Sequence, residues 1–285
     1  MVNGRHILLL LIAFLTGCES EVNNVKLPDF KPQIVISAFI TPGNNITYAD
    51  VSTTKRVFGV LGNDILRGAV SVTISDGEKE TIMTRSGDRF FFRNESNSIS
   101  PGKTYSLKVI SQYYPEASSS CTVPDRIRQN ITLDTFSIAR SEMGFNWNEL
   151  MFRLSFDDQP GKENFYRVIL RYIAYSSPTG YRKYTEDYYI PLEKELFTDK
   201  KVNSEGKFTI EDRLNFYPST YNDSAFLKVY ILNTDNSYYL FHKSIGDYDN
   251  NPSPFSEPSL VYSNINGGVG IFSSFTSDSL IFRLK

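Results

Sequence analysis

Short segments in which apolar and polar residues alternate recur along most of the chain, and a period of two limits such segments to β-strands. The segment Val70-Ser71-Val72-Thr73-Ile74-Ser75 is the clearest, and Asp76-Gly77 follows it with residues suited to a tight turn. Residues 105–109 alternate again after the turn dipeptide Pro101-Gly102. Further strands are expected over residues 34–39, 80–83, 89–92, 131–138, 150–156, 165–174, 182–190, 226–232, 260–264 and 280–284.

One segment has the spacing of a helix instead. Aromatic and aliphatic residues within 238–245 recur at helical intervals, Asp235 or Ser237 can cap the first turn, and Gly246 predicts the end. The fold class is therefore mainly β with one short helix.

The order of these strands predicts two domains. A hairpin followed by Pro-Gly-x-x-Tyr-x-Leu-x-Val resembles small surface β-sandwiches of the fibronectin type III or collagen-adhesin B kind. Val123-Pro124-Asp125 closes this run of strands. We expect a fibronectin type III-like β-sandwich over residues 34–124 and a larger β-rich domain, containing the helix, over residues 125–285.

The N-terminus predicts export and a lipid anchor. Residues 1–17 combine Arg5 with the apolar run 7–15, which is typical of a signal peptide and too short to span a bilayer. Leu15-Thr16-Gly17-Cys18 resembles the bacterial lipobox, in which the cysteine is acylated and becomes the first mature residue. An ordinary secretory signal with a chance cysteine is the alternative. Acylation at Cys18 supplies enough buried hydrocarbon for stable membrane attachment.

The residues after Cys18 indicate which membrane surface the chain is attached to. Glu19-Ser20-Glu21 resembles the surface-export signal of Bacteroidota lipoproteins, although a solvated pair of charges is the simpler reading. Residues 18–33 lack periodicity and are expected to form a flexible tether after the acylated cysteine. The expected location is the outer membrane, with the chain lipid-anchored and facing the cell surface.

The composition leaves little for catalysis. A net charge of −2 over 285 residues argues against nucleic-acid binding, which selects a basic face. After processing, Cys121 and His242 are the remaining thiol and imidazole; Cys121 is expected to be buried or half-buried, and His242 packed or half-exposed. Asp157-Asp158 and Glu186-Asp187 are adjacent pairs on strands, so their carboxylates point to opposite faces. We expect neither enzymatic activity nor a cofactor.

Two groups of residues are candidates for ligand binding. Asp247, Asp249 and Asn251 match the first positions of a calcium loop, but proline occupies the later glycine and glutamate positions, so the candidate is weak. An Asn/Asp turn before proline explains the pattern equally well. Tyr residues crowd the region around residues 172–189, and exposed tyrosines can stack on sugars or anchor a peptide or protein. They can equally shield a wide sheet. The candidates for ligand contact are Tyr184, Tyr188 and Tyr189.

The C-terminal segment carries a family resemblance. Asn251-Pro252, then residues 254–258, then Asn264-Ile265-Asn266-Gly267-Gly268-Val269-Gly270-Ile271-Phe272 form an ordered series that resembles the ending of family 4249 of domains of unknown function, lipoproteins of Bacteroidota. Ser273-Ser274 departs from that pattern, where more glycine is expected. By itself, the glycine-rich stretch predicts a turn or bulge beside a strand rather than a phosphate loop, because no helix or Lys-Ser/Thr pair follows.

The resemblance implies a function by association. Members of this family often accompany TonB-dependent outer-membrane receptors, which implies a non-enzymatic binding or accessory subunit of a nutrient uptake system. A glycan or a peptide is the ligand class that we expect for it. A surface glycan or peptide hydrolase that uses carboxylates is one alternative. A structural or adhesive surface protein is another.

Overall fold

The computed structural model describes residues 30–55, 66, 68–87, 89–93, 99–126, 130–159, 161–176, 184–192, 194–201, 206–213, 224–249 and 260–284. Contacts divide the chain into Met1–Lys31 and Pro32–Lys285, and all elements described below belong to the second unit. No helix within the described ranges is long and apolar enough to cross a membrane.

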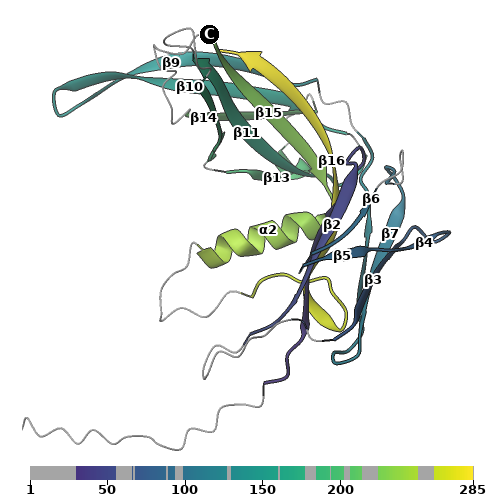
Figure 1. The fold of residues 1–285 in the computed structure, drawn as a ribbon. Helices are drawn as coiled ribbons and strands as arrows, with labels where there is room; N and C mark the ends of the chain where they lie inside the picture. Colours follow the sequence, from purple (N-terminus) through teal and green to yellow (C-terminus); the bar gives the residue numbers. More distant parts are fainter. Residues whose placement is uncertain are drawn as a thin grey trace, which may run out of the picture. The chain divides into compact units, whose positions relative to one another are not determined.

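The chain is mainly β, as its alternating pattern predicted, with one α-helix among the described residues (Figure 1). The strands are β1 (Ile34–Ile40), β2 (Ile46–Thr53), β3 (Val70–Ser75), β4 (Glu80–Ile82), β5 (Thr84–Ser86), β6 (Arg89–Arg93), β7 (Thr104–Ser111), β8 (Ala117–Thr122), β9 (Thr132–Glu142), β10 (Phe145–Asp157), β11 (Phe165–Ser176), β12 (Tyr184–Ile190), β13 (Leu196–Thr198), β14 (Lys207–Arg213), β15 (Ser224–Thr234) and β16 (Gly268–Arg283); the helix is α2 (Asn236–Asp249), and a 3-10 turn spans Asp199–Lys201.

The strands form three sheets. The largest has nine strands in the order β12-β11-β15-β16-β1-β2-β6-β5, with β13 pairing to β11. The other two are β4-β3-β7-β8 and β14-β10-β9. One hydrophobic cluster joins β1, β2 and β6 to the four-stranded sheet, and a second joins β11 and β15 to the three-stranded sheet. The large sheet therefore supplies one layer to each of two sandwiches, and the predicted β-sandwich is confirmed.

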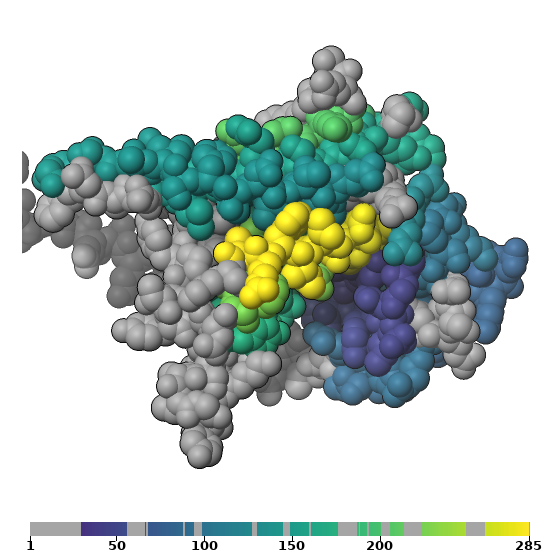
Figure 2. Space-filling model, turned by 90° about the horizontal axis from the view of Figure 1, so that it is seen from above, coloured from purple at the N-terminus to yellow at the C-terminus, as the bar shows by residue number. Residues whose placement is uncertain are grey.

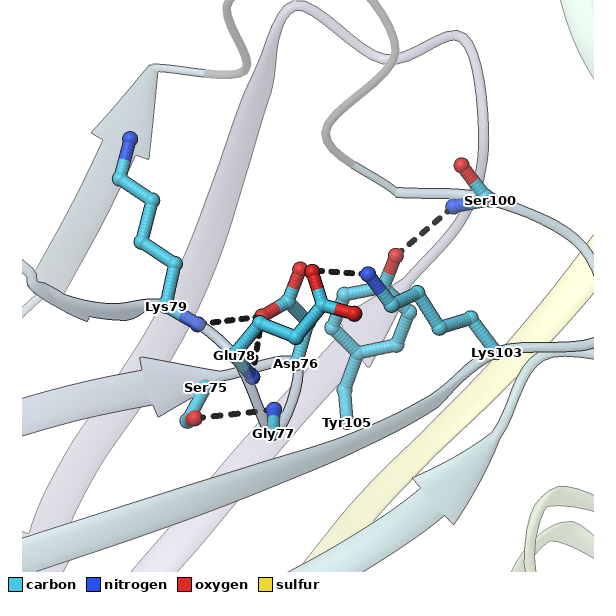
Figure 3. Close-up of polar contacts among 8 residues, drawn as sticks. All are labelled: Ser75, Asp76, Gly77, Glu78, Lys79, Ser100, Lys103 and Tyr105. Atoms are coloured by element: carbon cyan, nitrogen blue, oxygen red, sulfur yellow. Dashed lines mark hydrogen bonds and ion pairs between the residues drawn. The ribbon is translucent and has the colours of Figure 1, made fainter.

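The tight turn expected after β3 forms as the sequence indicates (Figure 3). Gly77 has φ of 90°, and Asp76 accepts hydrogen bonds from the backbone N–H groups of Glu78 (3.1 Å) and Lys79 (2.7 Å). The Lys103 ammonium also donates to Asp76 at 2.7 Å. These hydrogen bonds, with the side-chain bond to Lys103 contributing most, hold the pKa of Asp76 well below its usual range. Asp76 thus ties the β3–β4 hairpin to the turn before β7.

The last strand is shared by the two cores. Residues Gly268 to Ser274 of β16 pair parallel with β1, and Phe275 to Arg283 pair antiparallel with β15. Figure 2 shows the C-terminal residues in yellow beside the N-terminal strand in purple. Ile265 and Phe272 accordingly belong to the first cluster. The expected ranges 34–124 and 125–285 therefore match the two cores except at β16, which lies in the second range but contributes residues to the first core. A parallel pairing with a strand far away in the sequence leaves no local signal, so this contribution was not predicted.

Three glycines permit close backbone approach here, Gly268 and Gly270 to β1 and Gly267 to Glu116 just before β8. Gly270 has φ of 116°, and a Cβ there would lie 2.0 Å from the carbonyl oxygen of Ile36. Gly267 has φ of 74°, and its Cβ would lie 2.1 Å from the carbonyl oxygen of Glu116. At Gly268 the corresponding distance to the Ile34 carbonyl oxygen is 2.6 Å. The prediction that the glycine-rich stretch forms a turn beside a strand is confirmed, because Gly267 lies in a turn that leads directly into β16.

One expected strand is absent, and the helix ends later than expected. Residues 260–264 are not a strand. The Asn264 amide instead accepts from the Phe272 N–H (3.0 Å) and donates to the Phe272 carbonyl (2.7 Å), so a side chain takes the place of a ladder partner. The helix does not end at Gly246 but continues to Asp249, because Gly246 does not adopt the left-handed conformation of a helix stop. Asp235 caps it by accepting from the Tyr238 N–H at 2.8 Å.

Candidate binding site

A group of aromatic and basic side chains lies on the face of the large sheet that points away from the second core. Strand alternation buries Leu170 and Tyr172 and turns Arg171 to the opposite face. The β11 register sets Arg171 directly opposite Tyr189 on β12 and opposite Lys228 on β15. Three strands thus bring an exposed ring and two cations into one row.

Arg171 is held in a fixed orientation. Its guanidinium donates to both carboxylate oxygens of Asp187, at 2.5 and 2.6 Å, and lies 5.7 Å from the centroid of the Tyr189 ring. The hydrogen bond to Asp187 is the main reason that the pKa of Arg171 is raised. Bidentate pairing and ring contact together restrict both side chains. Tyr189 nevertheless keeps 65% of its surface exposed, so its ring is presented to solvent.

Tyr230 completes the group, which we call the Arg171 cluster: Arg171, Asp187, Tyr189, Lys228 and Tyr230. The Lys228 ammonium lies 4.6 Å from the Tyr230 ring centroid. Burial alone would raise the pKa of Tyr230, but hydrogen bonds from Lys228 and Arg171 to the phenolic oxygen outweigh it, and the pKa is lowered. With two cations and one carboxylate, the cluster carries a net positive charge and a row of π-faces.

A second site contains part of the same arrangement. Arg89 donates to Asp50 at 2.7 Å and lies 5.2 Å from the ring centroid of Tyr48, which is 45% exposed. The Arg–Asp–Tyr unit is therefore a recurring cross-strand contact in this fold. The Arg171 cluster differs by the added cation and phenol of Lys228 and Tyr230, so these residues mark it as a candidate for ligand binding.

Of the three tyrosines singled out in the sequence, Tyr189 alone has a described side chain. The backbones of Tyr184 and Tyr188 lie on β12, opposite Ser176 and Tyr172, and their side chains lie outside the described part of the structure. Their role in ligand contact stays a prediction. The cations on β11 and β15 were not found from the sequence, because cross-strand register is not encoded locally.

Two of the three residues of the weak calcium candidate lie in a helix and not in a loop. Asp247 is exposed on the last turns of α2, Asp249 is the final residue of that helix, and Asn251 lies outside the described residues. Within the described ranges, no group of three or more His, Cys, Asp or Glu side chains is close enough to hold a metal ion. A helical backbone also differs from the calcium loop that the spacing resembled.

The carboxylates weighed for hydrolysis are engaged separately. Asp157 accepts a hydrogen bond from Asn130, whereas Asp158 accepts from the Tyr166 hydroxyl at 2.6 Å and from Asn164 at 3.2 Å. Asp187 is bound to Arg171, and the side chain of its neighbour Glu186 is outside the described set. Neither pair forms a dyad among the side chains described.

The imidazole and thiol are packed. His242 lies 4.3 Å from Tyr238 and 5.7 Å from Phe39 between ring centroids, and burial lowers its pKa to about 4. Cys121 is buried, and burial raises the pKa of its thiol far above the usual range, so it is a poor nucleophile.

A cavity of about 430 Å³ lies where the two cores meet, and several polar groups on its walls are bonded within the protein. The Asp125 carbonyl accepts from Asn233 and from Thr276, each at 3.1 Å. The Asn164 amide donates to the Gln159 carbonyl at 2.8 Å. Because these groups are satisfied within the protein, the cavity acts as a polar joint rather than as the best candidate site. This joint was not predicted from the sequence, although the polar residues that follow the apolar part of β15 are consistent with it.

Fold and cluster together define a mainly β protein in which two sandwiches share one strand and one open sheet face carries aromatic and basic groups. The chain belongs to the family described as "Domain of unknown function (DUF4249)", whose model matches residues 21–281. A comparison with curated proteins finds no match. Among solved structures, a mutant of Salmonella alpha-2-macroglobulin is similar at 10% identity and a TM-score of 0.28; the match covers 76% of this chain and 14% of that one.

Proposed function

We propose that this chain is a lipid-anchored protein of the outer-membrane surface that binds a glycan or peptide as a non-enzymatic accessory subunit of a TonB-dependent uptake system. The sequence around Cys18 supports the anchor, and the family resemblance supports the association. The observation that carries the binding role is the Arg171 cluster.

The cluster has the properties that a binding surface needs. Tyr189 offers a rigid aromatic face at low entropic cost, because its neighbour Arg171 is already fixed by Asp187. Lys228 and Tyr230 supply hydrogen-bond donors two strands away from Tyr189, about 10 Å at the usual strand spacing. A ligand of roughly two sugar rings or two amino-acid residues spans that distance.

Binding is tested with panels of oligosaccharides and peptides, followed by titration calorimetry on the ligands that bind. We expect Tyr189→Ala to weaken binding about 10-fold, the scale of one lost aromatic contact. Lys228→Ala should weaken it by a similar factor, whereas Tyr48→Ala, which removes the matching ring at the second site, should leave affinity within about twofold. Equal affinity of the Tyr189 and Tyr48 variants would assign binding elsewhere.

Location and partnership are tested separately. Labelled palmitate should enter the wild-type chain and not a Cys18→Ser variant, and the wild type should resist extraction by salt. Purification from detergent-solubilised outer membrane should recover a β-barrel receptor with the chain. Recovery without a receptor would contradict the accessory role while leaving ligand binding intact.

A further inference from the structure

Strand β9 has one edge without a partner among the described strands. It pairs with β10 through eleven consecutive residues without a bulge, and β9 is the outer strand of its sheet. Its sequence, Thr132 to Glu142, contains no proline, glycine or lysine. Natural proteins protect such edges by short strands, bulges, proline or charged side chains, and β9 has only the last of these, in Asp134, Arg140 and Glu142.

The edge is large enough for a specific interface. Eleven residues extend about 37 Å, and two such strands paired antiparallel form roughly ten backbone hydrogen bonds, a number typical of stable protein–protein interfaces. At the turn after β9, Met143 is 90% exposed and has φ of 51°, an uncommon conformation for an apolar residue. The edge therefore ends in an exposed apolar side chain.

We propose that β9 pairs antiparallel with β9 of a second copy of this chain, around a two-fold axis at Ser137. This register sets Asp134 opposite Arg140 of the second copy, and the two-fold axis repeats the pair. It also sets Phe136 opposite Ile138. Both apolar side chains are half-buried in one copy, so the pairing covers surface that the monomer leaves partly open.

Neighbouring registers lack this match. The backbone N–H and C=O groups that point out of the sheet edge belong to alternate residues, and in an antiparallel pair two opposed residues must both point outward or both point inward. In a pair of identical strands this condition requires the two-fold axis to pass through a residue. An axis at Phe136 sets Asp134 opposite Ile138, and an axis at Ile138 sets Asp134 opposite Glu142, which is a pair of like charges. The axis at Ser137 alone among these three pairs opposite charges and apolar side chains together.

The charges of the existing sheet continue the pattern. In one cross-strand row, Asp134 lies opposite Arg153, and Arg153 lies opposite Glu211 and donates to it at 2.6 Å. Arg140 of the second copy would extend this row of alternating charge. Asp134 is exposed and makes no ion pair with another described residue. Arg140 donates to Glu149 through Nε and stays half-exposed, and no described side chain accepts from its other N–H groups.

Cross-linking tests the axis directly. In the full-length protein in detergent, Ser137→Cys places two thiols on directly opposed residues, with Cα atoms about 5 Å apart, within reach of a disulfide. In Ser141→Cys the two thiols lie about 27 Å apart along the strands. Mild oxidation should convert most of the first variant to a dimer and almost none of the second. The native Cys121 is buried and gives the same background in both. Equal cross-linking of the two variants would overturn the register.

Charge substitution tests the pairing itself by sedimentation equilibrium. Asp134→Lys should raise the dimer dissociation constant at least about 10-fold, and adding Arg140→Glu should restore most of the affinity, because the opposed charges are exchanged. Thr209→Lys, on the opposite edge strand β14, should have no effect. The proposal would be overturned if the wild-type protein stays monomeric at about 100 µM and its melting temperature does not change with protein concentration.

Discussion

Replacing Gly270 with alanine should strongly destabilise the folded chain. The residue has φ of 116°, a conformation that costs a non-glycine residue about 1–3 kcal/mol. The new Cβ would also lie 2.0 Å from the Ile36 carbonyl oxygen, which is backbone and cannot rotate away. Separating β1 from β16 to relieve that contact weakens two or more ladder hydrogen bonds, each worth about 1 kcal/mol. The expected loss is about 3–5 kcal/mol.

Two further glycines separate these effects. Gly43 has φ of 85° but nothing within 4 Å of its Cβ position, so Gly43→Ala tests conformation alone and should cost about 1–2 kcal/mol. Gly268 lies outside the left-handed region, and its Cβ would be 2.6 Å from the Ile34 carbonyl oxygen, so Gly268→Ala tests contact alone. We expect the loss at Gly270 to approach the sum of the other two.

Urea unfolding followed by circular dichroism measures all three variants. By calorimetry, a loss of 3–5 kcal/mol lowers the melting temperature of a unit of this size by about 6–20 °C. If Gly270→Ala does not fold, Gly268→Ala still tests the contact. Equal stabilities of the Gly268, Gly43 and Gly270 variants would refute the argument that close approach of β1 and β16 requires glycine.

Three other predictions concern titration and capping. The free energy of unfolding should decrease as the pH falls from about 6.5 to about 4, because burial, and to a smaller extent the charge of Arg167, lowers the pKa of His242 in the folded state. In urea titrations, His242→Gln should remove roughly 1–2 kcal/mol of this pH dependence, after allowance for partial solvation. Asp76→Asn should destabilise the chain at pH 7, and its difference from the wild type should shrink progressively as the pH falls below about 4 towards the much lower folded pKa of Asp76, because a lowered carboxyl pKa contributes stability that is lost across that window; thermal melts at pH 7 and at a series of acidic pH values check this. Asp235→Ala removes the helix cap and the acceptor of two hydrogen bonds from Ser274, at 2.8 and 3.0 Å, and should cost about 2–4 kcal/mol in urea unfolding.

Local signals in the sequence predicted the elements that local chemistry controls. The β3 alternation and the Asp76-Gly77 turn depend on residues next to each other, and both are present. The length of β9 was underestimated, because its exposed last residues through Glu142 carry no apolar alternation; they are ordered by pairing with β10. Residues 260–264 alternate like a strand, but the Asn264 side chain binds the β16 backbone in place of a ladder.

The candidate site was predictable only in part for a similar reason. Crowded tyrosines indicated the region of Tyr189, since aromatic residues are frequent both in strands and at binding surfaces. Arg171 and Lys228 join Tyr189 through pairings that span up to 57 residues of sequence. Such register depends on which strands become neighbours, and that is decided by the packing of both cores.

The shared strand links this site to the whole unit. Ser274 lies where β16 leaves β1 and joins β15, and it donates through its hydroxyl to the Thr122 carbonyl and to Asp235. The first sandwich, the helix cap and the second sandwich therefore meet at one residue, and separating any one of them breaks hydrogen bonds of the others. A ligand that binds the Arg171 cluster contacts β15, the direct neighbour of β16. By mass action such a ligand stabilises both cores together, although its site lies on one sandwich. We therefore expect a single melting transition whose melting temperature rises with ligand concentration.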